Sequence, residues 1–228
     1  QANFTNCTFN NNTIQGTDVD NVKGGVIYIE GGTANFESST FSDNESNRYG
    51  GVAYVESGGI LTMNGVTMDS STAGTDGGAI YSEGGPILLI DTDISVSEAG
   101  SSGGTIYITG DLNASGSSIT HSTAGNNGGA IWVDGSLSLN TSTISNSTAS
   151  ENGGGIYLLG TGVSDSSSIK HNEAVEGGGV YCIGDLEFSS SSIDSNTATF
   201  SLNDTEGVDH NNGGGGVFIL GDIEFDDS

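Results

Sequence analysis

Asn127-Gly128-Gly129-Ala130-Ile131-Trp132-Val133 decides the fold, because close variants of this stretch return along the whole chain. Each of eight copies has Gly-Gly, a small or branched residue, an apolar residue and an aromatic residue, and the copies begin at residues 24, 50, 77, 103, 128, 153, 177 and 214. Their starts are separated by 26, 27, 26, 25, 25, 24 and 37 residues. A nearly constant period of this length is typical of a solenoid, in which each repeat buries its apolar face only against its neighbours.

A second pattern occupies the other half of each repeat. Two apolar residues stand five positions apart, as in Phe4 with Phe9 and Phe36 with Phe41. Three residues later a polar residue follows in every repeat: Asn12, Asn44, Ser71, Ser97, Ser122, Ser147, Asn172 and Asn196. Each repeat therefore holds two or three short strands, with Gly, Asn, Asp and Ser at corners that need unusual backbone angles.

These repeats predict an all-β fold, a right-handed parallel β-helix (solenoid) of about eight rungs with roughly 25 residues per rung. The one proline, Pro86, fits this fold because the strand ladder needs nearly every backbone N–H. Residues 1–228 are expected to form one β-helix repeat domain, either a section of a longer array or a unit that polymerises through unpaired rungs. The break in the period predicts an insertion at residues 199–212.

The charge of the chain excludes two classes of partner. There are 29 acidic residues against Lys23, Arg48 and Lys170, which gives a formal net charge of -26 at pH 7. Nucleic acids and anionic membrane surfaces would repel such a protein. The sequence has no run of about 20 apolar residues, so no transmembrane segment is expected.

Sequons for N-linked glycosylation indicate a secretory route and an extracellular or cell-surface location, if they are used. Their asparagines are Asn3, Asn6, Asn11, Asn44, Asn113, Asn140, Asn146 and Asn203. Ser and Thr are so abundant that about five sequons would arise by chance, so their number alone carries little weight.

Strand alternation places one aromatic residue of each repeat on the outer face. The residues of this expected stripe are Tyr28, Tyr54, Tyr81, Tyr107, Trp132, Tyr157, Tyr181 and Phe218. Three interpretations stay open. The rings stack on one another and stabilise the strands, they form an interface with other copies or related extracellular repeat proteins, or they bind glycans.

Beside the stripe, Glu30, Glu56 and Glu83 are expected in one outward-facing column. Like charges one strand spacing apart form either a solvated acidic face or a candidate calcium site, because calcium prefers oxygen ligands. No other metal or cofactor is expected.

Catalysis has little support in the sequence. Asp91 and Asp93 are a tight acidic pair near a strand, while His121, His171 and His210 fall in corners or loops of different rungs. No Ser-His-Asp arrangement follows from these positions. The chain is therefore expected not to be an enzyme, and a polysaccharide lyase or hydrolase is the least favoured alternative.

The two cysteines, Cys7 and Cys182, lie seven repeats apart. At a strand spacing of about 4.8 Å that separation is roughly 30 Å, which is far beyond disulfide reach. Cys182 is expected to fill a core position, and Cys7 either packs in the same way or links to another segment or chain.

Gly-Gly-Ala-Ile at residues 77–80 and 128–131, with Phe-x-x-Asn at 9–12 and 41–44, resembles the polymorphic outer membrane protein repeats of chlamydial surface proteins. The resemblance covers nearly the whole chain, and the motifs drift elsewhere to Gly-Gly-Gly-Ile and Ile-x-x-Asn. It implies a right-handed β-helix that serves as a surface adhesin, and it assigns no catalytic residues. We therefore expect an extracellular structural or adhesive rod that assembles laterally or end to end in a surface or filamentous glycoprotein, with a glycan-binding adhesin as the alternative.

Overall fold

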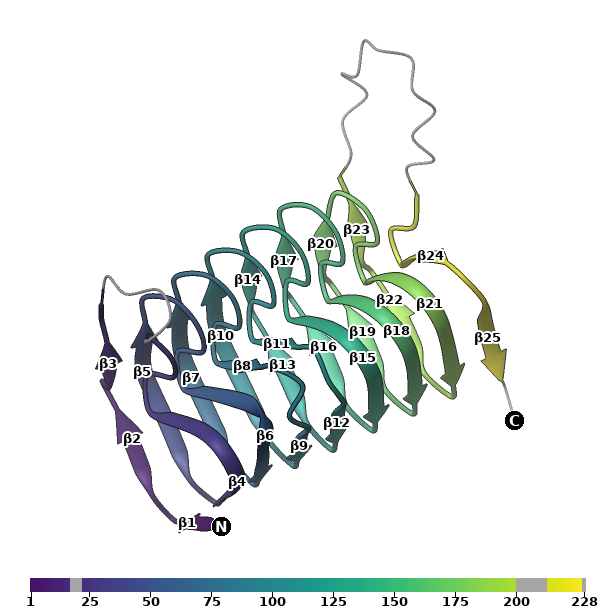
Figure 1. Ribbon diagram of the computed structural model, residues 1–228. Coiled ribbons are helices and arrows are strands. Elements are labelled where there is room, and N and C mark those ends of the chain that lie inside the picture. Colours follow the sequence, from purple (N-terminus) through teal and green to yellow (C-terminus); the bar gives the residue numbers. More distant parts are fainter. Residues whose placement is uncertain (17–21, 200–212, 227–228) are drawn as a thin grey trace.

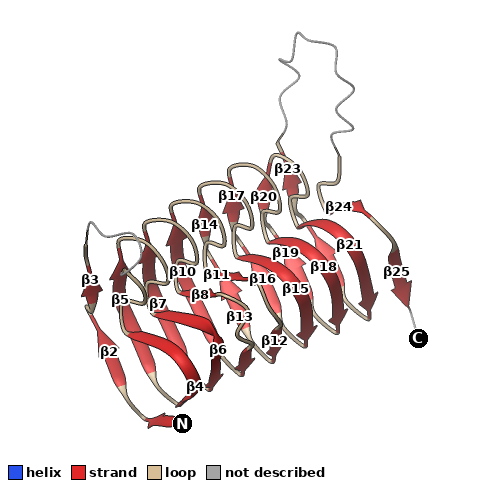
Figure 2. Cartoon of the chain, in the orientation of Figure 1, coloured by secondary structure: helices blue, strands red, loops and turns tan. Residues whose placement is uncertain are grey.

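The strands coil into a parallel β-helix. In the computed structural model, which describes residues 1–16, 22–199 and 213–226, successive strands stack side by side along one axis (Figure 1). The described residues form strands, turns and loops, with no helix among them (Figure 2). The predicted all-β fold and the parallel pairing of its strands are confirmed.

Two sheets make up the coil. The first follows the order β1-β4-β6-β8-β11-β15-β18-β21-β24, and β9, β12 and β25 continue the same rungs. Its strands are β1 Ala2–Thr5, β4 Ile27–Glu37, β6 Ala53–Asn64, β8 Ile80–Ser82, β9 Ile87–Ile90, β11 Ile106–Ile108, β12 Leu112–Ser115, β15 Ile131–Asn140, β18 Ile156–Asp165, β21 Val180–Ser189, β24 Val217–Leu220 and β25 Ile223–Asp226. The second sheet contains β2 Thr8–Asn10, β3 Thr13–Ile14, β5 Thr40–Ser46, β7 Thr67–Ala73, β10 Asp93–Ala99, β13 Ser118–Thr120, β14 Thr123–Ala124, β16 Thr143–Ser145, β17 Thr148–Ala149, β19 Ser168–Lys170, β20 Glu173–Ala174, β22 Ser192–Asp194 and β23 Thr197–Ala198.

The pairing register reproduces the sequence repeat. Leu89 pairs with Ala114, and Ala114 pairs with Leu139, so these two steps along the axis are 25 residues each. The last step runs 37 residues from Phe188 to Phe225. It spans the insertion predicted at 199–212, of which all but Thr199 lies outside the described residues. The coil makes about seven turns of about 25 residues, which agrees with the predicted period.

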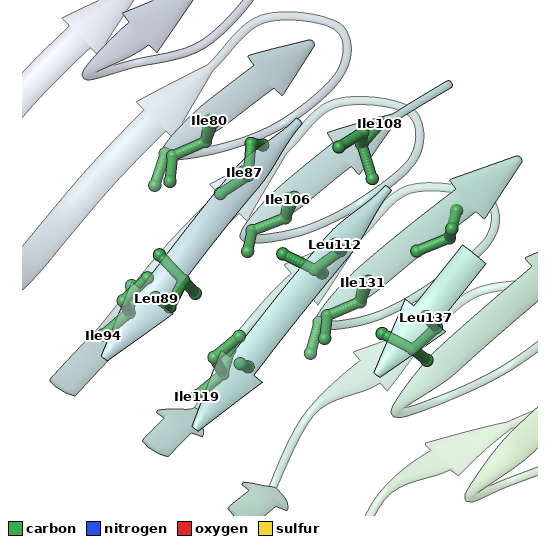
Figure 3. Close-up of a cluster of buried hydrophobic side chains, with 14 of the residues drawn as sticks. Ile80, Ile87, Leu89, Ile94, Ile106, Ile108, Leu112, Ile119, Ile131 and Leu137 are labelled. Atoms are coloured by element: carbon green, nitrogen blue, oxygen red, sulfur yellow. The ribbon is translucent and has the colours of Figure 1, made fainter. Parts of the chain in front are cut away.

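Aliphatic side chains from both sheets fill the inside of the coil. Ile80, Ile106 and Ile131 occupy the same position in three successive rungs, and Ile94 and Ile119 come from the second sheet (Figure 3). All five are buried. Burying one such side chain contributes roughly 1.5–3 kcal/mol. Because each one packs on the rungs above and below, a rung is stable only in the stack.

One corner of the second sheet takes a left-handed backbone in every described rung, with φ between 53° and 56°. The residues at this corner are Asn11, Asp43, Ser70, Val96, His121, Asn146, His171 and Ser195. Asn and Asp tolerate this conformation better than other non-glycine residues, whereas a β-branched side chain is strained in it. Val96 is therefore the residue at this corner whose backbone conformation is most strained.

Directly after this corner lies the predicted column of buried polar side chains. The Asn172 amide donates hydrogen bonds to the Ile144 carbonyl at 3.1 Å and to Asn196 Oδ1 at 3.0 Å, while its own Oδ1 accepts the Ser147 N–H at 2.9 Å. In four rungs the position is serine, and in two of these the hydroxyls, those of Ser71 and Ser97, are buried without a partner in the described part of the chain. Asparagine therefore satisfies this site better than serine.

The side chains of the polar column pack against the third residue of the Gly-Gly motif. A Cβ atom on Gly155 would lie 3.0 Å from Asn172 Nδ2, and one on Gly179 would lie 2.9 Å from Asn196 Nδ2. Where the column has serine, the facing residue is larger: the Thr105 hydroxyl lies 2.5 Å from the Ser122 hydroxyl. In these two rungs the third glycine of Gly-Gly-Gly therefore leaves room for the asparagine side chain.

Candidate functional site

The pairing register aligns the predicted aromatic stripe, so that the aromatic residue of each rung pairs with that of the next. We call this set the aromatic ladder; its members are Tyr28, Tyr54, Tyr81, Tyr107, Trp132, Tyr157, Tyr181 and Phe218. From Tyr81 to Phe218 neighbouring ring planes lie within 2–7° of parallel, with centroids 4.1–6.1 Å apart. The rings thus stack face to face along the outside of the first sheet.

This stacking determines which parts of the rings meet solvent. From Tyr81 to Tyr181 each ring is stacked between two neighbouring rings, so the ring edges face outward. Tyr28, at one end, is 44 % exposed, whereas Tyr81 to Phe218 are only partly exposed. The stacked rings of the ladder therefore present their edges to solvent and not their faces.

The expectation that Tyr54 is exposed is wrong, since only 1 % of its surface is accessible. Its side chain points outward as strand alternation requires, but neighbouring side chains cover it. Tyr49 packs against its ring with a centroid distance of 6.1 Å, and Lys23 Nζ lies 4.6 Å from its centroid. Lys23 and Tyr49 pair through a β-bridge between adjacent rungs, which places both beside the ladder.

Sequence reasoning missed Lys23, Arg48 and Tyr49. The Arg48 Nη2 donates a hydrogen bond to the Tyr49 hydroxyl at 3.0 Å, and the Tyr49 ring packs 4.7 Å from that of Tyr81. Lys23 and Tyr49 each stand directly before a Gly-Gly pair. Their shared position relative to Gly-Gly could have predicted that they are neighbours, because residues at the same position of successive repeats are aligned on adjacent rungs.

Two ladder tyrosines donate hydrogen bonds to carboxylates. The Tyr28 hydroxyl donates to Glu56 Oε1 at 2.5 Å, and the same oxygen accepts a hydrogen bond from Lys23 Nζ at 2.9 Å. The hydrogen bond from Tyr28, and to a smaller extent that from Lys23, lowers the pKa of Glu56. The hydrogen bond to Glu56 in turn raises the pKa of Tyr28 to about 12. The Tyr54 hydroxyl donates to Glu83 in the same way.

Ladder phenols resist ionisation because they are withdrawn from water. Burial, reinforced by the carboxylate of Glu83, raises the pKa of Tyr54, and burial is also the main cause of the raised pKa of Tyr81. Burial raises the pKa of Tyr107 to about 12. The pKa values of Tyr157 and Tyr181 are raised for the same reason. Desolvation disfavours the charged phenolate, so the ladder is neutral over the physiological pH range.

Glu56 and Glu83 are neighbours on successive rungs, where the Glu83 N–H donates to the Val55 carbonyl at 2.8 Å, but the expected column is interrupted next to Glu30. Ile29 pairs with Val55 and Gly31 with Gly58, so a register shift falls at Glu30. Phenol hydroxyls already engage Glu56 and Glu83. In the described ranges no group of three or more His, Cys, Asp or Glu side chains is placed to hold a metal ion.

A row of side chains beside the ladder changes from acidic to apolar along the axis. Asp134 pairs with Leu159, Leu159 with Ile183, and Ile183 with Leu220. We call Leu159, Ile183 and Leu220 the apolar row. Ile183 is 39 % exposed, and the row lies two residues beyond Tyr157, Tyr181 and Phe218 on the same strands. One half of this face is thus acidic and the other half apolar.

The predicted sequons differ in accessibility. Exposed side chains are present at Asn3, Asn6, Asn11, Asn113, Asn140 and Asn146. Asn44 is fully buried, and its Nδ2 donates a hydrogen bond to the Phe9 carbonyl at 2.9 Å. A glycan on this nitrogen is incompatible with the folded rung. Asn203 lies outside the described residues.

The described acidic and histidine residues that were considered for catalysis are all exposed. Asp91, Asp93, His121 and His171 are all exposed, and His210 lies outside the described residues. Cys7 and Cys182 form no disulfide with one another, as the repeat spacing predicted. Cys182 is buried in a core position, and burial raises the pKa of its thiol to about 11. Among the described residues no helix is long and apolar enough to cross a membrane.

The comparison with protein families agrees with this geometry. The model of the right-handed β-helix region matches residues 1–161, which is more than half of the chain. The chain belongs to the right-handed β-helix family. Family membership confirms the predicted handedness of the coil. No curated protein and no solved structure matches this β-helix in the same comparisons.

Proposed function

We propose that this right-handed β-helix is a structural rod of an extracellular or cell-surface glycoprotein. The observation that carries the proposal is the aromatic ladder, which joins successive rungs on the outside while the aliphatic core joins them on the inside. Stacked aromatic pairs contribute roughly 0.5–1.5 kcal/mol each beyond the area that they bury. Repeated at each rung, such contacts favour a stiff, extended particle.

The ladder geometry favours a structural role over glycan binding. A sugar ring stacks on an aromatic side chain by covering its face. Between Tyr81 and Tyr181 both faces of each ring are already covered by neighbouring rings. The glycan-binding adhesin therefore lacks a free aromatic platform along this stretch and is the weaker hypothesis.

The apolar row is the part of the surface that we propose for lateral assembly with other copies or related repeat proteins. At a net charge of -26, two identical chains repel one another over most of their surfaces. The apolar row, Leu159, Ile183 and Leu220, lies beside the ladder and contains no charged side chain. Contact between copies through this stretch buries apolar surface.

The motifs shared with chlamydial-type surface repeats support the same class of function. Gly-Gly provides the left-handed corner before each ladder strand, as at Gly77 and Gly128, and the asparagine of Phe-x-x-Asn is the buried Asn44. The shared motifs are therefore those that build a rung. Membership of that particular group remains part of the proposal.

Electron microscopy and sedimentation velocity of the purified protein at near-physiological salt test this function. Rods that associate side by side are expected, and Ile183→Glu should yield single rods. Ile60→Glu is the matched control, because Ile60 is 41 % exposed on β6, away from the apolar row. Compact particles would contradict the rod. Equal association of both variants and the parent would contradict the proposed contact.

A further inference from the structure

All seven tyrosines and the single tryptophan of the chain belong to one contiguous aromatic stack. Seven of these eight residues are members of the ladder, and Tyr49 packs against Tyr54 and Tyr81 at its side. No tyrosine or tryptophan lies elsewhere in the sequence. The side chains that lose a single electron most readily, apart from thiols, are therefore concentrated in one line.

The spacing within this line is uneven and favours one direction. Trp132 and Tyr107 have centroids 4.1 Å apart, followed by 5.0 Å from Tyr107 to Tyr81 and 4.9 Å from Tyr81 to Tyr54. On the other side the first step, from Trp132 to Tyr157, is 6.1 Å. Electronic coupling between stacked rings falls steeply with distance. Exchange of an electron is therefore favoured on the side of Trp132 that leads to Tyr54.

Tyr54 differs from the other ladder tyrosines in being both buried and bonded to a carboxylate. An oxidised phenol becomes a strong acid and must lose its proton, so it needs a base within hydrogen-bond distance. Tyr28 also has a carboxylate partner, but Glu56 is shared with Lys23, which makes it a poorer proton acceptor. In the described residues, no carboxylate accepts a hydrogen bond from Tyr157 or Tyr181.

We propose that the aromatic ladder conducts one-electron oxidation from Trp132 to Tyr54, where the oxidising equivalent is held as a buried tyrosyl radical. A one-electron oxidant, such as a metal polypyridyl complex or an oxygen-centred radical, removes an electron from the Trp132 indole and is itself reduced. The electron that restores the indole comes from Tyr54 and crosses the stacked rings of Tyr81 and Tyr107, which bridge the two residues and keep their own electrons and protons. As Tyr54 loses its electron, its O–H bond breaks and the proton forms a new O–H bond with Glu83.

The product is a neutral tyrosyl radical beside a protonated carboxyl group, with electron and proton both accounted for. Burial of Tyr54 keeps this radical from coupling with a second molecule, so it should persist longer than a radical on an exposed tyrosine. The ladder would in this way divert oxidation from the buried Met63, Met68 and Cys182. This redox activity is independent of the proposed role as a rod.

Flash photolysis with a ruthenium polypyridyl complex and an electron acceptor tests the proposal. The photogenerated ruthenium(III) complex is cationic and is drawn to the acidic surface. In the parent protein the indole radical should decay as a long-lived tyrosyl radical appears, detected by transient absorption and electron paramagnetic resonance. Tyr54→Phe should abolish the long-lived signal, and Glu83→Gln, which keeps an acceptor but removes the base, should shorten its lifetime.

Interruption of the path provides the directional control. Tyr107→Leu should prolong the indole radical and suppress the long-lived tyrosyl signal, whereas Tyr157→Leu, on the other side of Trp132, should leave both unchanged. Circular dichroism identifies the variants that remain folded. A long-lived tyrosyl radical of equal yield in folded Tyr54→Phe, or equal effects of the two leucine variants, would overturn the proposal.

Discussion

The rings of Tyr107 and Trp132 lie 4.1 Å apart between centroids and 2° from parallel, which makes them the closest pair of the aromatic ladder. The two residues are register partners on β11 and β15. Strand pairing therefore places the two side chains beside one another, and their stacking joins adjacent rungs on the outer surface.

Replacing Tyr107 should weaken this contact on both sides. Tyr107→Ser removes stacking against Tyr81 and Trp132, and we expect the free energy of unfolding to fall by about 2 kcal/mol. Thr109→Ser is the control, because Thr109 is exposed just beyond the same strand. Urea unfolding followed by circular dichroism measures both. Equal stability of the two variants would show that the ladder contributes nothing to the fold.

High pH should unfold the protein through its tyrosines. Tyrosine ionises at about pH 10 in an unfolded chain, whereas the pKa values of Tyr28 and Tyr107 in the folded protein are raised to about 12. A raised folded-state pKa leaves stability constant below the unfolded value and lowers it as pH rises above that value. We expect a cooperative loss of the fold above about pH 10.

Phenolate absorbance and near-ultraviolet circular dichroism should therefore change together in that titration. The control is the same protein in concentrated urea, where the phenols should titrate near pH 10 without cooperativity. Independent ionisation of the tyrosines near this pH in the folded protein would contradict the burial of the ladder.

Val96→Asn should stabilise the protein. Val96 has φ 53° at the left-handed corner and is 53 % exposed, so its replacement relieves strain and removes little buried surface. We expect a gain of about 1 kcal/mol, seen as a higher thermal midpoint. Val163→Asn, an exposed substitution within β18, should give no gain. A midpoint that is unchanged in both variants would mean that the corner carries no strain.

Gly155 and Asn172 should behave as a coupled pair. Gly155→Ala brings a Cβ atom within 3.0 Å of Asn172 Nδ2 and should destabilise the fold. In the Asn172→Ser background the same change recreates the Ala130 and Ser147 combination of the preceding rung and should cost less. A double-mutant cycle by urea unfolding should give a coupling energy of about 1 kcal/mol. Additive effects would refute the proposed size match.

Expression through a eukaryotic secretory pathway should leave Asn44 unmodified. Its amide is buried and hydrogen-bonded, whereas Asn113 and Asn140 are exposed on the first sheet and should accept glycans. Mass spectrometry of peptides from the folded protein measures occupancy at each site. A glycan at Asn44 in protein with native circular dichroism would contradict the burial of this side chain.

The fold could be predicted because one period governs strands, corners and core alike. A repeat near 25 residues with apolar, glycine and polar positions at fixed places leaves few alternatives to a β-helix. The aromatic alignment followed from the same period. Strand alternation, however, predicts only the side of the sheet, so the covering of Tyr54 by Tyr49 and Lys23 could not be derived from it.

Local irregularities explain the other differences. The acidic column was expected from constant register, but the shift between β4 and β6 interrupts it at Glu30, and Glu56 and Glu83 accept hydrogen bonds from Tyr28 and Tyr54. The match of Gly155 with Asn172 was visible in the sequence as two drifting motifs. Their physical connection appears only when the coil brings them together across the core.

The constant register step from Leu89 to Ala114 to Leu139 makes the middle of the protein modular. Deleting or duplicating one such block, for example residues 103–127, would leave every remaining strand with an equivalent partner. Unequal recombination within the coding sequence could thus lengthen or shorten the particle in steps of one strand spacing, about 4.8 Å. Evolution can tune the reach of such a molecule without redesigning its packing.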